Sequence, residues 1–557
     1  MRFSGRDHLR SLARAGGAIL TAVILIAVVL AAAAGGGCGQ NPREDRAVAD
    51  ASSRPVPGGT AVIALSSDPG VLNPLLYDAA IAGLVYAEMH DGLTEMDENL
   101  AWQPRIATGW QVDPDGMALT YFLRPWRWSD GLPLTARDVV ASFALFKDPA
   151  VASPRRGFYK DVLRASAPDS ATVRYEFARP LPDPVQRTWH HILPWHKVKD
   201  LEPAAVGSWP LNAAPLSSGE FMLAEQAHNR YVTLVRNPLY PGTPALLERV
   251  VLQVIPQESV QVMALEVGEV DLVDRMPPAA ARRLAAGDKV RIVSTGGRRF
   301  YYLQWNLRNP RFADALTRRA LSLAIDRSRL IDTLVLGYGQ AAGGPIPPAV
   351  WNHHPRLAAP PHDAQLARTL LAEAGWSDPD ADGVLERDGL ALTFEILTKQ
   401  GDPVRESGAI ILRENLAEVG AKVTCQVLEM AAGLARVNAG RFDAYFGQLN
   451  ANLYGDPSGY VHSSAVQEFN QGHYANARVD SLLELALGIT EREAALPYWW
   501  QLQEILAEDP PAAYLFYPDN LVGISNRLHD VRPHLLSPIN NLAEWWIAPQ
   551  DRKFRSE

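Results

Sequence analysis

Apolar and polar residues follow one another along the chain in runs that predict a folded body of mixed strands and helices. Residues 60–65, TAVIAL, form a short apolar run typical of a buried strand, and residues 117–125, MALTYFLRP, alternate as a half-buried strand does. Further strand-like runs are YVTLVRNPLY, RVVLQVIP, FYYLQWNL, LALTFEILT, AKVTCQVLE, RFDAYFGQL and, near the C-terminus, AAYLFYPDNLVGI. The first half of the body therefore reads as one α+β unit, and residues from about 300 to 505 as a second.

Helix-like segments separate the strands of the second unit. DALTRRALSLAID places Leu316, Ala320 and Leu323 on one face of a helix. In AQLARTLLAEA, Asp363 suits the N-cap position and Gly375 ends the apolar period. This order of strand, helix and strand predicts an α/β lobe with a largely parallel sheet.

The N-terminus has the pattern of an export signal. Four arginines precede an uncharged, strongly apolar stretch over residues 15–37, and Cys38 follows small residues. GGGCGQ resembles a bacterial lipobox, in which the cysteine becomes the lipidated N-terminus, with Gly35 where leucine is usual. We predict a lipoprotein-like signal peptide over residues 1–37, lipidation at Cys38 and a flexible tether over residues 38–57. An uncleaved membrane anchor is the alternative, because the stretch is long enough to span a bilayer.

Length and charge narrow the class of protein. A chain of 557 residues is too long for one core, so two or three domains are expected. The net charge of −9, without a basic stripe, argues against binding to nucleic acid. The second of the two cysteines, Cys425, lies in a strand-like run and reads as a small core residue without a disulfide partner.

The segment YFLRPWRWSDGLPLTARDVVASFAL combines aromatic residues with an acid and a helix start. Trp126, Trp128 and Asp130 have the chemistry of a ligand pocket, but each also has a local structural reason. Thr135 suits an N-cap, and Asp138 can return the bond as in a capping box. Scaffold is the favoured interpretation and ligand contact the alternative.

The longer segment IATGWQVDPDGMALTYFLRPWRWSDGLPLTARDVVASF resembles the signature of the family 5 extracellular solute-binding proteins, the peptide-, dipeptide- and nickel-type binding proteins of ABC importers. GGTAVIALSSDPGVLNPL, VTLVRNPLY, ALEVGEVDL and YYLQWNLRNPRFADALTRRALSLAIDRSRLI resemble other family segments in the same order, over roughly residues 58–530. The resemblance implies an α/β type II periplasmic-binding-protein fold, with two lobes, a ligand cleft and two hinge crossings. Lobe I would cover residues 58–299 with a family-type inserted subdomain, lobe II residues 300–509, and residues 510–557 would return to lobe I.

Motifs of catalysis are missing from the sequence. It contains no G-x-S-x-G, H-E-x-x-H or P-loop, so we predict neither an enzyme nor a cofactor. DPDADGVLERDG carries Asp378, Asp380 and Asp382 at the spacing of a calcium loop, but Gly389 stands where such a loop needs a bidentate glutamate. We name no metal ligand, and the choice between a solvated turn and a weak calcium site stays open.

The candidate ligand-binding residues come from the resemblance and from loops expected to face the cleft. In peptide-binding relatives an aspartate four residues before the proline of a DP-like turn often holds the ligand's amino group, and in NANLYGDPSGY that position is Leu453. Asn452 and Asp456 are the possible substitutes. The full set of candidates is Asp68, Asn73, Tyr77, Trp305, Asn306, Trp351, Asn450, Asn452, Tyr454, Asp456 and Tyr460.

The resemblance implies a monomeric substrate-binding protein in the cell envelope, lipid-anchored in the periplasm or at the outer face of the cytoplasmic membrane. It would close around a peptide-like or other small solute and deliver it to the permease subunits of an ABC importer. The alternatives are a solute sensor or chaperone of the same fold without transport and, more remotely, an extracytoplasmic hydrolase. The choice between a peptide, a sugar and a metal complex stays open.

Overall fold

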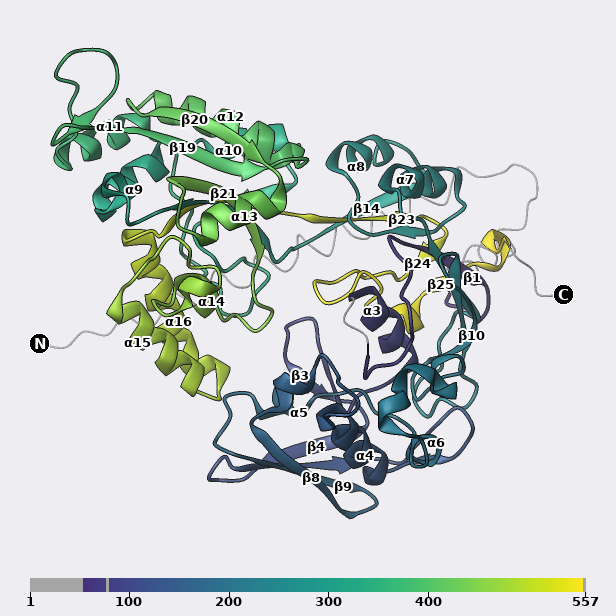
Figure 1. The fold of residues 1–557 in the computed structure, drawn as a ribbon. Coiled ribbons are helices and arrows are strands. Elements are labelled where there is room, and N and C mark those ends of the chain that lie inside the picture. The colour runs from purple at the N-terminus through teal and green to yellow at the C-terminus, as the bar shows by residue number, and fades with distance from the viewer. Residues whose placement is uncertain (1–53, 77–79, 554–557) are drawn as a thin grey trace, which may run out of the picture. The chain divides into compact units, whose positions relative to one another are not determined.

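The structure, a computed structural model, describes residues 54–76 and 80–553. The predicted signal peptide, Cys38, most of the tether and Tyr77 lie outside these ranges, so what we predict for them stays a prediction. Within the described ranges, no helix combines the length and the apolar character that crossing a bilayer requires. The strands and helices gather into sheet-centred units (Figure 1).

The first large sheet, with the helices on it, is lobe I. Its seven strands come from both ends of the chain. In spatial order they are β10 (Phe221–Ala227), β11 (Tyr231–Arg236), β12 (Arg249–Val254), β1 (Thr60–Leu65), β13 (Leu272–Val273), β23 (Asn520–Ser525) and β14 (Val290–Thr295). β1 pairs in parallel with β12 and β13, and the other pairings are antiparallel. The helices of this lobe include α3 (Ala80–Met89), α7 (Glu258–Val267) and α8 (Pro278–Leu284).

β1 lies at the centre of this sheet because every position after Thr60 is apolar and buried. Ile63 and its neighbours two residues away pack into a cluster that contains Tyr86 of α3. Val62 and Ala64 point to the other face and pack with Leu265 of α7. A strand with apolar side chains on both faces needs cover on both faces, and helices provide it.

A subdomain is inserted between β1 and β10, with its own core. Its four-stranded antiparallel sheet has the order β4 (Ala107–Val112), β5 (Ala118–Leu123), β9 (Thr172–Phe177) and β8 (Val162–Asp169). The remaining elements are β2 (Thr94–Met96), β3 (Trp102–Pro104), β6 (Trp126–Arg127), β7 (Pro133–Leu134), α4 (Ala136–Lys147), α5 (Pro184–Thr188) and α6 (Trp195–Val198). α4 packs against β8 and β9, as Figure 1 shows in the blue part of the chain.

The tryptophans of the aromatic and acidic segment are buried, which favours the scaffold interpretation. Trp128 has no exposed surface, and its indole nitrogen donates to Asp138 at 3.3 Å. The predicted capping box of α4 is confirmed, since the Thr135 amide donates to the same carboxylate at 2.8 Å. Trp126 is also buried and donates to the Ser218 carbonyl. Asp138 therefore joins a turn and a helix start inside one core.

Lobe II contains the second large sheet. Its six strands have the order β16 (Gly339–Ala341), β22 (Ala512–Pro518), β15 (Arg299–Trp305), β21 (Ala444–Asn450), β19 (Thr393–Lys399) and β20 (Lys422–Leu428). β19 is parallel to both of its neighbours, but β15 is antiparallel to β21 and β22. The expectation of a largely parallel sheet was therefore wrong. Helices α12 (Pro403–Ala417) and α13 (Met430–Asn438) link the parallel strands, whereas β15 receives the chain from β14 of lobe I and β22 returns it to β23.

The helices of lobe II form two groups. α9 (Ala315–Leu323), α10 (Arg327–Leu334), α11 (Ala364–Glu373) and α12 (Pro403–Ala417) enclose the main core, with α13 (Met430–Asn438) beside β19. α15 (Ala477–Gly488) and α16 (Arg492–Glu508) pack on each other around a core of their own. The predicted face of α9 is confirmed at Ala320, which is buried, and at Leu323, which packs partly buried against the main core. Arg318 is buried as well, because it donates to the Pro510 carbonyl at 2.9 Å and pairs with Asp509.

Two short chain segments connect the lobes, and they run side by side. β14 and β23 pair as far as Thr295 and Asn520 in lobe I, while β15 and β22 pair from Tyr301 and Phe516 in lobe II. A Cβ atom on Gly297 would come within 2.9 Å of the Pro518 carbonyl, so the first crossing needs glycine for this close approach. The return crossing follows Pro518, later than the predicted boundary at residue 510. The run AAYLFYPDNLVGI holds two strands, β22 and β23, where the sequence suggested one.

A buried ion pair fixes the returning chain to lobe I. Asp271 has no exposed side-chain surface and accepts from the Val62 amide at 2.8 Å. Arg527, beyond β23, donates to Asp271 Oδ1 at 2.5 Å and to the Thr60 carbonyl at 3.0 Å. One carboxylate therefore joins the first strand, the loop before β13 and the C-terminal return.

Several carboxylates surround Arg105 where the inserted subdomain meets lobe I. The guanidinium lies 2.9 Å from Asp91 and 3.6 Å from Glu95, and it also contacts Glu220 and the Tyr240 hydroxyl. Burial, followed by repulsion from Glu220, raises the pKa of Asp91 to about 7, although Arg105 acts in the opposite direction. Glu88 lies near Glu220 and Asp91 as well, and its pKa is also raised, chiefly by burial. One arginine does not neutralise four carboxylates, so the cluster retains a proton near neutral pH.

This proton makes stability depend on pH. The unfolded pKa of Asp91 is 3.8, so between about pH 4 and pH 7 the folded state binds more protons than the unfolded state. The contribution of this group to stability is therefore fully present at low pH and is lost as the pH rises through the folded pKa. The variant D91N does not titrate, so its melting temperature is expected to rise relative to wild type between pH 5 and pH 8. For the exposed control D200N, the difference in melting temperature from wild type is expected to stay constant over this pH range. A constant difference for D91N as well would contradict the prediction.

Candidate ligand-binding site

The carboxyl ends of the parallel strands mark the candidate site in each lobe. In open α/β sheets, ligands bind in the crevice outside these ends. In lobe I the segments that follow β1 and β13 are residues 66–76 and 274–275, and in lobe II residues 400–402 follow β19 and residues 451–454 follow β21. The first crossing runs directly beside the last of these segments, since the Ala451 amide donates to the Arg298 carbonyl at 2.7 Å.

The loop after β21 carries most of the predicted site residues, and hydrogen bonds fix its path. Trp351 donates from its indole nitrogen to the Tyr454 carbonyl at 2.9 Å. Tyr460 donates from its hydroxyl to the Asn450 carbonyl at 2.8 Å, and the Asn452 side chain accepts from the Tyr454 amide at 2.8 Å. These bonds hold Trp351 and Tyr460 against the loop that carries Tyr454, and their role in binding a ligand stays a prediction.

Gly455 sets the turn of this loop. Its φ of 80° lies in the left-handed region, and a Cβ atom there would meet the Asn352 side chain at 2.2 Å. Asn352 donates to the Gly455 carbonyl at 2.8 Å, and Asp456 accepts from the Ser458 amide at 2.8 Å. Asp456 therefore terminates a local turn, and one of its carboxylate oxygens is engaged by the backbone.

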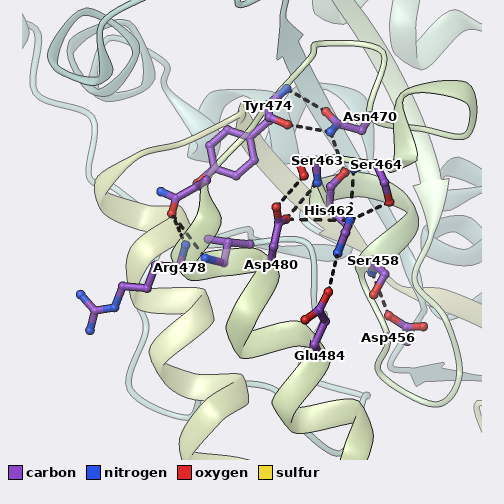
Figure 2. A network of polar contacts seen from close by, with 12 residues as sticks. Asp456, Ser458, His462, Ser463, Ser464, Asn470, Tyr474, Arg478, Asp480 and Glu484 are labelled. Atoms are coloured by element: carbon purple, nitrogen blue, oxygen red, sulfur yellow. Dashed lines mark hydrogen bonds and ion pairs between the residues drawn. The ribbon is translucent and has the colours of Figure 1, made fainter.

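Figure 2 shows the polar network that continues from this loop to α15. Ser463 donates from its amide and its hydroxyl to Asp480, at 2.9 and 2.5 Å. His462 Nδ1 lies 2.8 Å from the Ser464 hydroxyl, and its Nε2 lies 3.8 Å from Glu484. These contacts join residues 462–464, which follow α14 (Ser458–Val461), to α15.

The same residues have the types of a hydrolase triad but not its geometry. In a triad the serine and the acid bind opposite nitrogens of the imidazole. Here Ser464 and Asp480 both face Nδ1 of His462, with Asp480 at 3.9 Å, and the 3.8 Å to Glu484 is too long for a hydrogen bond. This cluster gives the hydrolase alternative no support.

Trp305 ends β15 and Asn306 follows it, at the far end of the strand from the crossing. Trp305 has no exposed surface and packs on Phe312 with ring centroids 5.0 Å apart. Asn306 is buried and donates to the Phe442 carbonyl at 2.7 Å. The sequence placed both near the crossing, but the crossing precedes β15, so our proposal for the site leaves them out.

Asp68 and Asn73 shape the loop after β1. Asp68 accepts from the Gly70 amide at 2.6 Å and from the Asn229 amide. Burial raises the pKa of Asp68, but these amide bonds outweigh it and lower that pKa below its usual value. Asn73 is buried and donates to the Asn212 side chain at 2.8 Å. Both residues use their polar groups to fix the loop.

The structure adds two arginines that the sequence analysis missed. Arg298 lies at the first crossing and donates to the Ala451 carbonyl at 2.9 Å. Arg492, at the start of α16, lies 5.1 Å from the centre of the Trp351 ring. The pair of arginines in GGRRF was the signal available for the first, whereas no local pattern distinguishes the second.

Tyr454 connects this loop with the inserted subdomain. Its pKa is raised by burial, and its hydroxyl shares a hydrogen bond with Gln186 of α5. Burial also lowers the pKa of Arg492, against the opposing influence of Asp183 and Asp97 of the same subdomain. Side chains from both lobes therefore surround Tyr454.

The acidic loop of lobe II lies apart from these residues. Carboxylate oxygens of Asp378, Asp380 and Asp382 lie within 4.8 Å of one another, and Asp378 also accepts from the Gly383 amide at 3.0 Å. The spacing noted in the sequence thus becomes a cluster in space. It supplies three carboxylates, fewer ligands than calcium takes in a complete loop, so calcium binding stays an open prediction.

Two lobes with mixed sheets, two adjacent crossings and site loops at the strand ends define a type II periplasmic binding protein. The chain belongs to the bacterial extracellular solute-binding proteins, family 5, because the model of that family's middle region matches residues 101–470.

Known proteins resemble this chain over most of its length. The oligopeptide-binding protein AppA of Bacillus subtilis is 26% identical over 524 residues, which cover 92% of this chain and 96% of AppA. The structure of AppA in complex with a nonapeptide covers 89% of this chain and 100% of that chain, with a TM-score of 0.65. The substrate-binding protein CtaP of Listeria monocytogenes, at 21% identity, covers 88% of this chain and 100% of that chain with a TM-score of 0.75, which shows the shared fold.

Proposed function

We propose that this protein captures a peptide-like solute outside the cytoplasm and delivers it to an ABC importer. The observation that carries the proposal is the pair of adjacent crossings between two lobes whose strand ends carry the aromatic and basic residues of the site. The proposal is supported by the membership of the chain in family 5 and by its similarity to an oligopeptide-binding protein over most of its length.

Hinged closure is the mechanism that this architecture favours. Changes of backbone angles in two short segments, at residues 296–298 and after Pro518, are enough to turn one lobe against the other. A ligand that contacts both lobes binds the closed form better and shifts the population toward it. The permease then distinguishes loaded from empty protein by shape, and no covalent step is needed.

The site proposed for the ligand consists of the loop after β21 with its neighbours. Trp351, Tyr454 and Tyr460 supply aromatic surface, while Asn450 and Asn452 supply polar groups. Asp456, Asp68 and Asn73 act mainly by fixing the loops, and Tyr77 remains a candidate from the sequence.

Export and anchoring belong to the same proposal. We infer that residues 1–37 are removed as a signal peptide and that a lipid on Cys38 holds the protein at the outer face of a membrane. The mass of the N-terminal peptide of the mature protein distinguishes a lipidated Cys38 from an intact anchor.

Ligand binding to the full chain, purified in detergent, tests the proposal. A mixture of random peptides of three to nine residues is expected to raise the melting temperature, because a ligand at 100 times its dissociation constant stabilises the folded state by about 2.7 kcal/mol. The peptides retained after washing are then identified by mass spectrometry. Transport of the retained peptides by cells that carry the neighbouring importer genes, and its loss on deletion of this gene, would favour delivery over sensing. A melting temperature unchanged by every peptide would count against the peptide ligand, and turnover of a bound peptide would favour the hydrolase.

A further inference from the structure

We propose that Arg298 is an anion-binding residue of the ligand site, so that the site takes a solute through a carboxylate rather than through a free amine. This inference rests on the proposed function and deepens it. It is carried by the position of Arg298, by the groups around its guanidinium and by the acid that the site loop lacks.

Arg298 is held in place from two directions. Its carbonyl accepts from the Ala451 amide at 2.7 Å, and its guanidinium Nη1 donates to the Ala451 carbonyl at 2.9 Å. Side chains alternate along the extended chain, so Arg298 lies on the same face as Phe300 at the start of β15. Phe300 packs on Tyr460 with ring centroids 5.8 Å apart. The guanidinium is therefore fixed between the first crossing and the site loop, where a ligand would contact both.

Among the described residues, no acid pairs with Arg298. The groups that influence its charge are the hydroxyls of Tyr460 and Tyr454 and the guanidinium of Arg275. Arg275 has an acid of its own, Asp274, at 3.5 Å. Arginine remains charged in proteins, so a partly buried positive charge is left without a counter-charge.

Other arginines show how this chain satisfies a buried guanidinium. Arg405 lies 2.8 Å from Asp402, and Arg527 contacts Asp271. Arg327 has no acid but donates to the carbonyls of Tyr514, Ser322 and Pro360, among other acceptors. Arg298, by contrast, makes one described side-chain bond, to Ala451. Because a guanidinium has five N–H donors, most of its donors remain for a partner that the chain itself does not supply.

The acids near the site do not offer an ammonium group a comparable place. Leu453 occupies the position of the acid that holds the amino group in peptide-binding relatives, and Asp456 accepts from the Ser458 amide. A carboxylate placed beside Tyr454 would gain charge-assisted bonds from Arg298 and a neutral one from the Tyr454 hydroxyl, while the Tyr460 hydroxyl already donates to the Asn450 carbonyl. The site is therefore matched to the negative end of a solute.

The test uses the full chain in detergent with random hexapeptides in matched forms. The C-terminus is either a free carboxylate or an amide. Each of these two forms is made with and without aspartate and glutamate, and with either a free or an acetylated N-terminus. Wild type is expected to retain carboxylate-bearing peptides roughly tenfold or more over amides without acidic residues, and to be indifferent to acetylation. The comparison of the two carboxylate sources shows whether the C-terminus or a side chain is bound.

Variants assign the preference to Arg298. R298Q is expected to lose the preference for carboxylates while its melting temperature stays close to that of wild type, and R298K is expected to keep part of it. The matched control is R319Q, which removes the same charge from an exposed position on α9 and is expected to retain the preference.

The outcomes separate this inference from the proposed function. Peptide binding that ignores both the C-terminal form and R298Q would overturn the inference and leave the function intact. If wild type retains no peptide, the peptide function fails, and a panel of non-peptide mono- and dicarboxylates takes the place of the peptides. Loss of carboxylate binding in R298Q then supports the inference, and no carboxylate binding by wild type overturns it.

Discussion

Replacement of Trp128 by alanine is expected to lower the free energy of unfolding by about 3–5 kcal/mol. The indole is fully buried in the core of the inserted subdomain, and truncation would leave a cavity of nearly its own size. It would also remove the donor to Asp138, whose carboxylate binds the Thr135 amide and the Trp195 amide, the latter at 2.8 Å. Urea unfolding followed by circular dichroism measures the loss.

The same variant tests whether the aromatic segment is scaffold. W128A is expected to keep the ligand preference of wild type at temperatures where it is folded, because no surface of Trp128 is open to a ligand. The control is F122A, which truncates an aromatic residue that is 43% exposed on the neighbouring strand β5 and should cost far less. A W128A protein that unfolds like wild type but selects different ligands would show that the scaffold interpretation is wrong.

Replacement of Arg527 by methionine is expected to destabilise lobe I by about 3–5 kcal/mol. The substitution leaves Asp271 without its main counter-charge at a position with no exposed surface. The loss is large because removal of one partner of a buried pair strands the other charge away from water, whatever the net contribution of the intact pair. Equilibrium unfolding in urea, monitored by tryptophan fluorescence, gives the difference.

A second substitution makes this prediction specific. The double variant D271N/R527M removes both charges and is expected to recover part of the lost stability, since the uncompensated charge is gone. The surface pair of Arg164 and Glu176, with 2.7 Å between its charged atoms, provides the control, and R164M is expected to unfold nearly as wild type does. Equal losses in the single and double variants would show that packing, rather than charge, holds the return segment.

Local order along the chain predicted the elements that depend on neighbouring residues. The apolar run of residues 60–65 became β1, Asp363 caps α11 by accepting from the Leu366 amide, and Thr135 and Asp138 form the predicted capping box. These features are set within a few residues, where periodicity and capping chemistry act. The sequence was less informative where one strand follows another directly along the chain, as in the run that divides into β22 and β23.

The proposed ligand site shows the same division between local and tertiary information. The sequence supplied the loop residues Trp351, Tyr454 and Tyr460, and the structure brings them together through backbone hydrogen bonds. Burial of Trp305 and Asn306 could not be read from the sequence, because it depends on which end of β15 faces the crossing. Arg298 and Arg492 came to the site only in space, since residues 298 and 451, or 351 and 492, meet through the tertiary fold.

By itself the sequence predicted export and, through its resemblance to the family to which the chain belongs, two α/β lobes, because apolar period, capping and ordered motifs are local properties. Only the tertiary structure decided where the chain crosses between the lobes, which way β15 pairs and which charges lack partners. Those properties depend on contacts between residues far apart in the chain. In our proposal, the property that bears most directly on the ligand is the positive charge of Arg298, with which no described carboxylate pairs.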